Sequence, residues 1–286
     1  MKKTVIGMAF IMSFLTLSLL TLSAVTFFGA TESKADSVLS KTKEYRYFVE
    51  RGGGVEIREY IGKKKKVTVP AKIDGKDVVS VGGFSGTNVT SVTIPDSVTS
   101  IGNSVFAGCE KLKKAKLSKK IKTIPCYAFS GCNSLTTIKM SDKVSIIEDN
   151  AFANCGELKT IGNLTLTEVG RSAFKNCKKL AGTFTLDSSI EEIPDDSFNN
   201  CKKLTFRIPD KDLKVGVRAF AGCPGISEKY ISPDIHAGAY AGCTNIDTVI
   251  IKDDNVVEEN GIYYSKDRII SLKYRKSPST VQNVSL

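Results

Sequence analysis

The sequence predicts an α/β-type repeat solenoid, in which each repeat of 20–24 residues contributes one parallel strand and a helical or 3₁₀ turn on the opposite side. Two observations predict this fold. Seven of the eight cysteines recur at intervals of 23, 23, 22, 24, 22 and 20 residues, and segments of alternating polarity follow them. A hairpin signal near the N-terminal end of the array predicts a hairpin cap there.

Each repeat follows one template: Ile or Val, four residues, Phe or Tyr, two residues, Cys, two residues, and Leu or Ile. The first copy consists of Ile101, Phe106, Cys109 and Leu112. Four apolar positions held at fixed offsets through seven copies do not arise by chance, so the array is a strong signal of architecture. The template cysteines are Cys109, Cys132, Cys155, Cys177, Cys201, Cys223 and Cys243.

The spacing inside a repeat predicts its local structure. Phe, Cys and Leu lie three residues apart, which suits a helical or 3₁₀ turn that presents one face to the core. The segment Leu135–Met140 then alternates in polarity as a strand does, with Ile138 expected inward and Lys139 outward. Stacked repeats can close a core that a single repeat cannot, because neighbouring strands hydrogen-bond about 4.8 Å apart.

The first 35 residues have the features of an export signal. Lys2 and Lys3 precede an apolar run over residues 5–28, and Ser33–Ala35 has small residues where a signal peptidase reads them, which favours cleavage before Asp36. The run exceeds the usual 7–15 residues, and at roughly 20 residues or more it is long enough to span a bilayer, so an uncleaved anchor is the alternative. In either case we expect the rest of the chain to be secreted or displayed at the cell surface.

The repeats resemble a known family. The segment Ile94–Gly102, leading into Val105–Cys109, is similar to the BspA-like class of leucine-rich repeats, and the resemblance extends over about residues 45–275. It is specific for architecture and says little about function. It implies a bacterial or protozoan secreted or surface protein that takes part in adhesion, host contact or envelope interactions.

Four segments are expected on this basis: a signal peptide (1–35), an N-terminal cap (36–76), the leucine-rich-repeat solenoid (77–252) and a C-terminal hairpin-like cap (253–286). Glu44–Glu50 and Val55–Tyr60 alternate in polarity around three consecutive glycines, which predicts a hairpin in the first cap. Asn260–Asp267 resembles the hairpin insert that often interrupts arrays of this family.

No catalytic, cofactor or metal site is predicted. The template cysteines are expected to be small, buried, apolar side chains, although an even count of eight in an exported chain leaves a disulfide framework as the alternative. Cys126 lies outside the template and is a candidate exposed thiol. The only histidine, His236, is expected on a surface turn, and without any Cys-x-x-Cys it provides too few ligands for a metal.

The outward face of the predicted sheet is the candidate ligand-binding surface. Its polar residues are expected in two columns, rich in Thr and interspersed with Lys and Arg, which could hydrogen-bond glycans or carboxylates or attract polyanions. The alternative is that β-branched polar residues simply suit exposed strands. The candidate ligand-binding residues are Lys114, Lys116, Lys139, Thr165, Thr185 and Arg207.

The charge indicates the class of partner. Lys and Arg number 41 against 30 Asp and Glu, a formal charge of +11 that favours acidic partners. We expect a non-catalytic, adhesin-like module that binds an extracellular protein or glycan. The alternative is a structural envelope protein held by its charge on anionic wall polymer. Specific recognition of nucleic acid is not expected because basic patches interleaved with aromatics are absent, and membrane contact is expected only if the N-terminal segment stays uncleaved.

Overall fold

The computed structural model describes residues 37–209 and 213–226, together with five short segments at 230–231, 239–243, 250–251, 256–259 and 262–265. The predicted signal peptide and His236 therefore lie outside the described residues. All regular elements within these residues are β-strands. No helix long and apolar enough to cross a membrane occurs among them.

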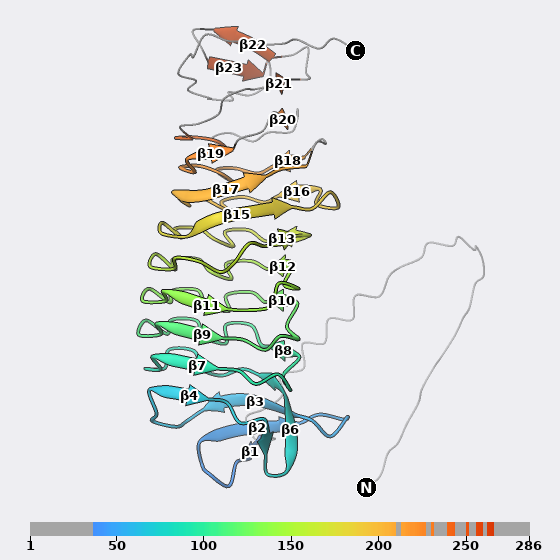
Figure 1. The fold of residues 1–286 in the computed structure, drawn as a ribbon, viewed down its shortest axis with the longest axis vertical. Helices are drawn as coiled ribbons and strands as arrows, with labels where there is room; N and C mark the ends of the chain where they lie inside the picture. Colours follow the sequence, from blue (N-terminus) through green and yellow to red (C-terminus); the bar gives the residue numbers. More distant parts are fainter. Residues whose placement is uncertain are drawn as a thin grey trace, which may run out of the picture. The chain divides into compact units, whose positions relative to one another are not determined.

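Parallel strands stacked in chain order form one side of the solenoid (Figure 1). The middle residues of its first four strands, Val67, Val92, Ala115 and Ile138, pair in register and are buried. The prediction of one such parallel strand per repeat is thus confirmed, with Ile138 inward and Lys139 exposed. One sheet contains β4 (Lys66–Thr68), β7 (Ser91–Thr93), β9 (Lys114–Lys116) and β11 (Thr137–Lys139); the next contains β13 (Thr165–Leu166), β15 (Ala181–Leu186), β17 (Lys203–Arg207) and β19 (Gly225–Ile226).

A second strand, of two residues in most repeats, ends on the Ile or Val that opens each template, and this strand was not predicted. Two residues are too short to show a period of two. Ile124, Ile147 and Val169 pair in register and are buried, so this row closes the core from another side. The strands of this row are β6 (Lys76–Val81), β8 (Ser100–Ile101), β10 (Thr123–Ile124), β12 (Ile146–Ile147), β14 (Glu168–Val169), β16 (Glu192–Ile193) and β18 (Lys214–Val215). Two further strands, β20 (Tyr230–Ile231) and β21 (Ile250–Ile251), pair parallel with each other and do not end on a template residue.

The Phe-Cys-Leu segments form hydrogen-bonded turns, and the predicted helical or 3₁₀ segments are not found among the described residues. Around Phe152, alternate N–H groups donate to carbonyls three residues earlier, and the intervening N–H groups donate to the following repeat. The residues two before and two after each Phe have positive φ, as at Asn150 (57°) and Asn154 (64°). Left-handed residues interrupt a right-handed helix, so the three-residue spacing arises from tandem β-turns.

Aromatic rings form a column through the core. From Phe106 to Tyr240, successive template rings lie 5.2–5.5 Å apart and are nearly parallel. The template cysteines lie beside this column, and each Sγ donates to the carbonyl of the Phe one repeat earlier at 2.9–3.2 Å. The same carbonyl also accepts from the backbone N–H three residues later in its own repeat, so the thiol adds a second hydrogen bond that links neighbouring repeats.

The described parts of the two predicted caps contain hairpins. β2 (Tyr45–Val49) pairs antiparallel with β3 (Val55–Tyr60), as predicted, and β3 then pairs parallel with β6. The remaining cap strands are β1 (Val38–Leu39) and β5 (Lys72–Ile73). β22 (Val256–Glu259) and β23 (Ile262–Ser265) form an antiparallel pair at the other end. Because β4 lies within residues 36–76 and pairs with β7, the parallel sheet begins inside the segment assigned to the cap.

Candidate binding surface

The first sheet presents a lysine-rich surface, here called the lysine face and defined as the outward side of β4, β7, β9 and β11. Its outward residues stand in two registered columns. The first column contains Lys66, Ser91, Lys114 and Thr137, and the second contains Thr68, Thr93, Lys116 and Lys139. The three candidate lysines on this face are exposed, and Lys116 lies directly opposite Lys139 on the adjacent strand.

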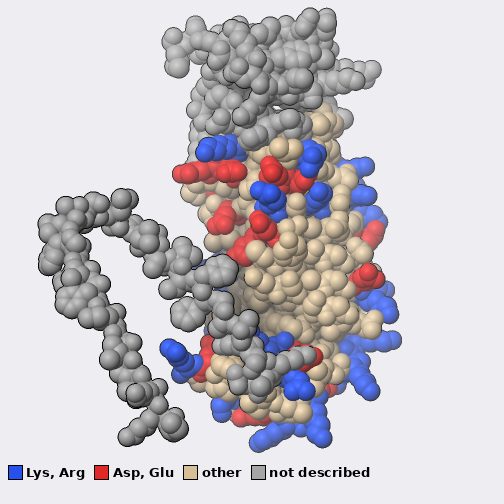
Figure 2. Space-filling model, turned by 180° about the vertical axis from the view of Figure 1, so that it is seen from behind, with Lys and Arg blue, Asp and Glu red and all other residues tan. Residues whose placement is uncertain are grey.

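The cations of this face are not neutralised by neighbours. In the described part of the chain, no ion pair within 4.0 Å involves Lys114, Lys116 or Lys139, and no carboxylate stands at an outward position of the four strands. Figure 2 shows the molecule from the opposite side to Figure 1: there Lys and Arg project along one edge, and uncharged residues cover the middle. Charge is thus unevenly distributed over the surface.

The second sheet presents a different surface, here called the threonine face and defined as the outward side of β13, β15 and β17. Thr165, Thr185 and Arg207 pair in register, so this part of the expected column exists. Beside it, the hydroxyls of Thr183 and Thr205 are 2.8 Å apart and share a hydrogen bond. The threonines of that neighbouring column therefore satisfy one another in part.

The two faces are not joined into one sheet. Between β11 and β13 the described chain has only an isolated bridge from Thr137 to Thr160. Gly162 has a φ of 90° and its N–H is bonded to the Thr160 hydroxyl, and pairing resumes only at Thr165. The six candidate residues consequently form two sets of three and do not form a single ladder.

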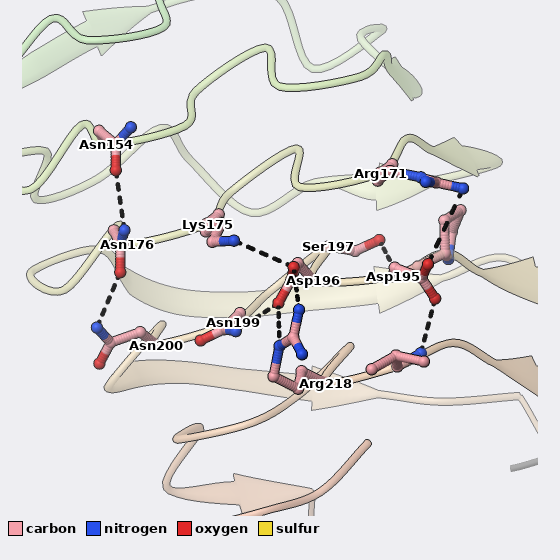
Figure 3. Close-up of polar contacts among 12 residues, drawn as sticks. Asn154, Arg171, Lys175, Asn176, Asp195, Asp196, Ser197, Asn199, Asn200 and Arg218 are labelled. Carbon is pink, nitrogen blue, oxygen red and sulfur yellow. Dashed lines mark hydrogen bonds and ion pairs between the residues drawn. The ribbon is translucent and has the colours of Figure 1, made fainter. Parts of the chain in front are cut away.

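A polar cluster on the turn side was not predicted from the sequence (Figure 3). The buried carboxylate of Asp196 accepts hydrogen bonds from Lys175 of the preceding repeat (3.1 Å) and from Arg218 of the following one (2.9 and 3.0 Å). Burial acts to raise the pKa of Asp196, but hydrogen bonds from Arg218, Asn199 and Lys175 outweigh it and hold the pKa well below the ordinary value. The cluster links three repeats electrostatically, because one carboxylate is paired with cations from the repeats on both sides.

Asparagines extend this linkage along the same side. The Asn176 side chain donates to Asn154 at 2.8 Å and accepts from Asn200 at 2.9 Å, so three consecutive repeats share a chain of amide bonds (Figure 3). All three residues have positive φ, which Asn tolerates better than most residues. The Gly or Asn before each template Cys was the sequence signal for these turns.

The cysteines are free thiols of low reactivity in this arrangement. All eight fall within the described residues and are free thiols, six of them buried. Burial raises the pKa of Cys155 and Cys177 well above the ordinary value, so both remain protonated at neutral pH. Cys126 is half-buried, and burial together with its bond to Glu148 raises its pKa as well. Among the described residues, no group of three or more His, Cys, Asp or Glu side chains could hold a metal.

A pocket of about 330 Å³ lies at the free edge of β4, next to the lysine face. Its charged groups already have partners: Lys64 pairs with Glu44 at 2.7 Å, Lys72 with Asp77 at 3.0 Å, and Asp74 accepts from Tyr47 at 2.9 Å. No charged group there is left free to select a ligand.

Comparison with known proteins identifies the repeats. The model of the BspA type leucine rich repeat region matches residues 77–205 and 167–285, in six copies, and so covers most of the chain. The chain belongs to this family. BspA-type repeats thus account for the template cysteines, the stacked strands and the tandem turns described above.

Solved structures of bacterial leucine-rich-repeat proteins are similar to this BspA-type chain. The T. pallidum protein TpLRR is 30% identical with a TM-score of 0.57, over 65% of this chain and 89% of its own. A Bacteroides ovatus leucine-rich repeat protein is 25% identical with a TM-score of 0.51, over 74% of this chain and 64% of its own. A leucine rich cell surface protein of Faecalibacterium prausnitzii is 24% identical with a TM-score of 0.50, over 81% of this chain and 59% of its own.

The chain therefore spans less than two thirds of the length of the Bacteroides and Faecalibacterium proteins. No curated protein matches the sequence. The BspA-type assignment consequently rests on the repeats and the fold.

Proposed function

We propose that this chain is a secreted or surface-displayed, non-catalytic binding module that engages an extracellular protein or glycan through the outward faces of its parallel sheets. The observation that carries the proposal is the lysine face, where exposed cations without ion-pair partners in the described chain stand in register on a sheet. The family, which is built from stacked repeats, supports a role in binding. The basic, apolar N-terminal segment supports export.

The sheet provides rigidity. Each outward side chain stands on a strand whose inward residues are buried in the same apolar core as the aromatic column, so the backbone is already ordered before a ligand arrives. A preorganised surface loses less conformational entropy on binding, which leaves more of the contact energy as affinity.

The two faces offer different chemistry. Exposed lysines attract anionic groups over several ångströms and act mainly on the rate of encounter. Threonine hydroxyls on the second face can donate to and accept from the hydroxyls of a sugar, and Arg207 can bind a carboxylate with two parallel hydrogen bonds.

The test is binding of the purified protein to a panel of matrix proteins, glycans and wall polymers at low and at physiological salt. We compare Lys116→Gln/Lys139→Gln with Thr185→Ala/Arg207→Gln, one pair from each face. Lys43→Gln/Lys178→Gln is the control pair, because these lysines are exposed and stand on no strand of either face.

We expect a saturable partner at physiological salt and loss of its binding in at least one face pair, with the control pair unchanged. Failure of every panel member to bind saturably, or equal weakening in all three pairs, contradicts the proposal.

A further inference from the structure

We propose that the lysine face is a docking site for a flexible polymer that carries repeating phosphate or sulfate groups. The inference rests on the proposed function of a binding module and assigns a ligand class to one of its two faces. The threonine face is then a separate surface with its own specificity.

The density of positive charge supports this assignment. Residues 111–122, which include β9 and the segments on either side of it, contain seven lysines, two of which, Lys114 and Lys116, stand on the lysine face. All seven are exposed, and none makes an ion pair in the described part of the chain. Lys66 on β4, with Lys65 just before it, and Lys139 on β11 add positive charge to two further strands of the first sheet. A surface with this much uncompensated charge releases repulsion when it binds an anion.

The spacing fits a chain better than a small ion. Lys116 and Lys139 lie on adjacent strands, about 4.8 Å apart at the backbone, whereas Lys66 and Lys114 are separated by Ser91 and lie about 10 Å apart. Lys114 and Lys116 are two residues apart on one strand, about 6.6 Å. The cations thus form an open two-dimensional array. A single small anion can reach only one or two of them, while a polymer lying across the strands contacts many.

The residue types favour phosphate or sulfate without bases. Lysine acts as a mobile point charge and suits tetrahedral anions that need no fixed orientation, whereas the bidentate recognition of carboxylates calls for arginine, which is absent from this face. No aromatic side chain stands at an outward position of the four strands. Single-stranded nucleic acid is held largely by stacking on aromatics, so this face is poorly suited to it.

The test uses four probes with the purified full chain: inorganic polyphosphate, heparin, poly-L-glutamate and single-stranded DNA. Binding is measured by fluorescence anisotropy across a salt series. The face variant is Lys66→Gln/Lys114→Gln/Lys116→Gln/Lys139→Gln. The control, Lys43→Gln/Lys178→Gln/Lys202→Gln/Lys214→Gln, removes the same charge from exposed positions outside both faces.

We expect the face variant to bind polyphosphate or heparin at least tenfold more weakly at low salt. The slope of log affinity against log salt concentration should also become shallower by about three, because four phosphate contacts are lost and each contributes roughly 0.7 to the slope. The control should remain within about twofold of the wild type. Comparison of polyphosphate with heparin identifies phosphate or sulfate as the preferred group.

Equal weakening in the face and control variants would reduce the effect to net charge and overturn the inference. Tighter binding of DNA or polyglutamate than of polyphosphate and heparin would also overturn it. If polyphosphate and heparin binding is unchanged in the face variant while a protein or glycan partner from the panel still binds through the threonine face, this inference fails and the proposed function stands. Circular dichroism and thermal unfolding of both variants establish that they are folded.

Discussion

Individual residues in this protein act mostly between repeats. Asp196 accepts from Lys175 in the repeat before it and from Arg218 in the repeat after it, and its own φ is positive. Its carboxylate is buried, so the energy of the cluster depends on the charge being present and fully bonded. Asp196 therefore links three neighbouring repeats, although nothing in the sequence distinguishes it from the other acidic residues.

Replacement of the Asp196 carboxylate should change how the free energy of unfolding depends on pH. The pKa of folded Asp196 lies below its ordinary value of 3.8, so the ionised group stabilises the protein above that pH, and the stabilisation is lost as pH falls towards the folded pKa. We expect Asp196→Asn to lower the free energy of unfolding at neutral pH by about 2 kcal/mol. Asparagine is the chosen replacement because it tolerates the positive φ at this position.

The measurement is urea unfolding of wild type and variant from pH 7 to pH 2. The difference between them should shrink below about pH 4. Glu191→Gln, at an exposed position with no ion pair in the described chain, is the control and should show no such pH dependence. A difference that stays constant across the whole range speaks against an ionic role.

At the level of elements, the tandem turns show most clearly what could be predicted from the sequence. The repeat, the parallel strands, the inward Cys and the first hairpin were predicted, because apolar periodicity reports which side chains are buried. The turns were not, since a spacing of three suits both a 3₁₀ helix and successive β-turns. Only the Gly or Asn before each Cys separates the two, because it marks a left-handed residue.

The binding faces were also predictable only in part. Alternation places Lys116, Lys139 and Arg207 outward, but it does not report how strands pair across repeats. The separation at Gly162 depends on one backbone conformation within an otherwise regular repeat. The charge cluster at Asp196 depends on side chains from three repeats, which no local pattern brings together.

Two glycines in these elements should respond differently to alanine. At Gly131 an added Cβ meets only ordinary contacts, the nearest at 3.7 Å, but φ is 72°, so Gly131→Ala should cost about 1–2 kcal/mol of backbone strain. At Gly170 a Cβ would collide with the backbone of residues 148 and 149, so Gly170→Ala should cost more.

Thermal and chemical unfolding of both variants measures this order. Gly52→Ala is the control, since a Cβ there meets nothing within 4 Å and φ is not positive. An equal loss of stability at Gly131 and Gly170 would contradict the distinction between strain and close approach.

At the level of the whole molecule, the array is stabilised chiefly by contacts between neighbouring repeats, as expected of a solenoid. Each aromatic ring is stacked between the rings of the repeats before and after it. Truncation of a ring in the middle of the column therefore weakens the interfaces with both neighbouring repeats. The binding faces lie outside the column.

Phe152→Ala tests this arrangement. Phe152 is fully buried, with ring centroids 5.3 Å from Phe129 and 5.4 Å from Phe174. Its truncation should lower the free energy of unfolding by about 3–5 kcal/mol. Denaturant unfolding checks the value, with the exposed Lys143→Ala expected within about 0.5 kcal/mol of wild type. A loss below about 1 kcal/mol at Phe152 would mean that the column contributes little to cohesion.

The regular row of thiols has a consequence for how the molecule can be studied. Six of the seven template Cys are buried as well as bonded to the carbonyl of a Phe one repeat earlier, so they are shielded from reagents while their repeats stay closed. Alkylation followed by mass spectrometry would therefore assign each opening event to a numbered repeat without any introduced label. The protein thus contains its own set of position-specific reporters of local unfolding, spaced at every turn of the solenoid.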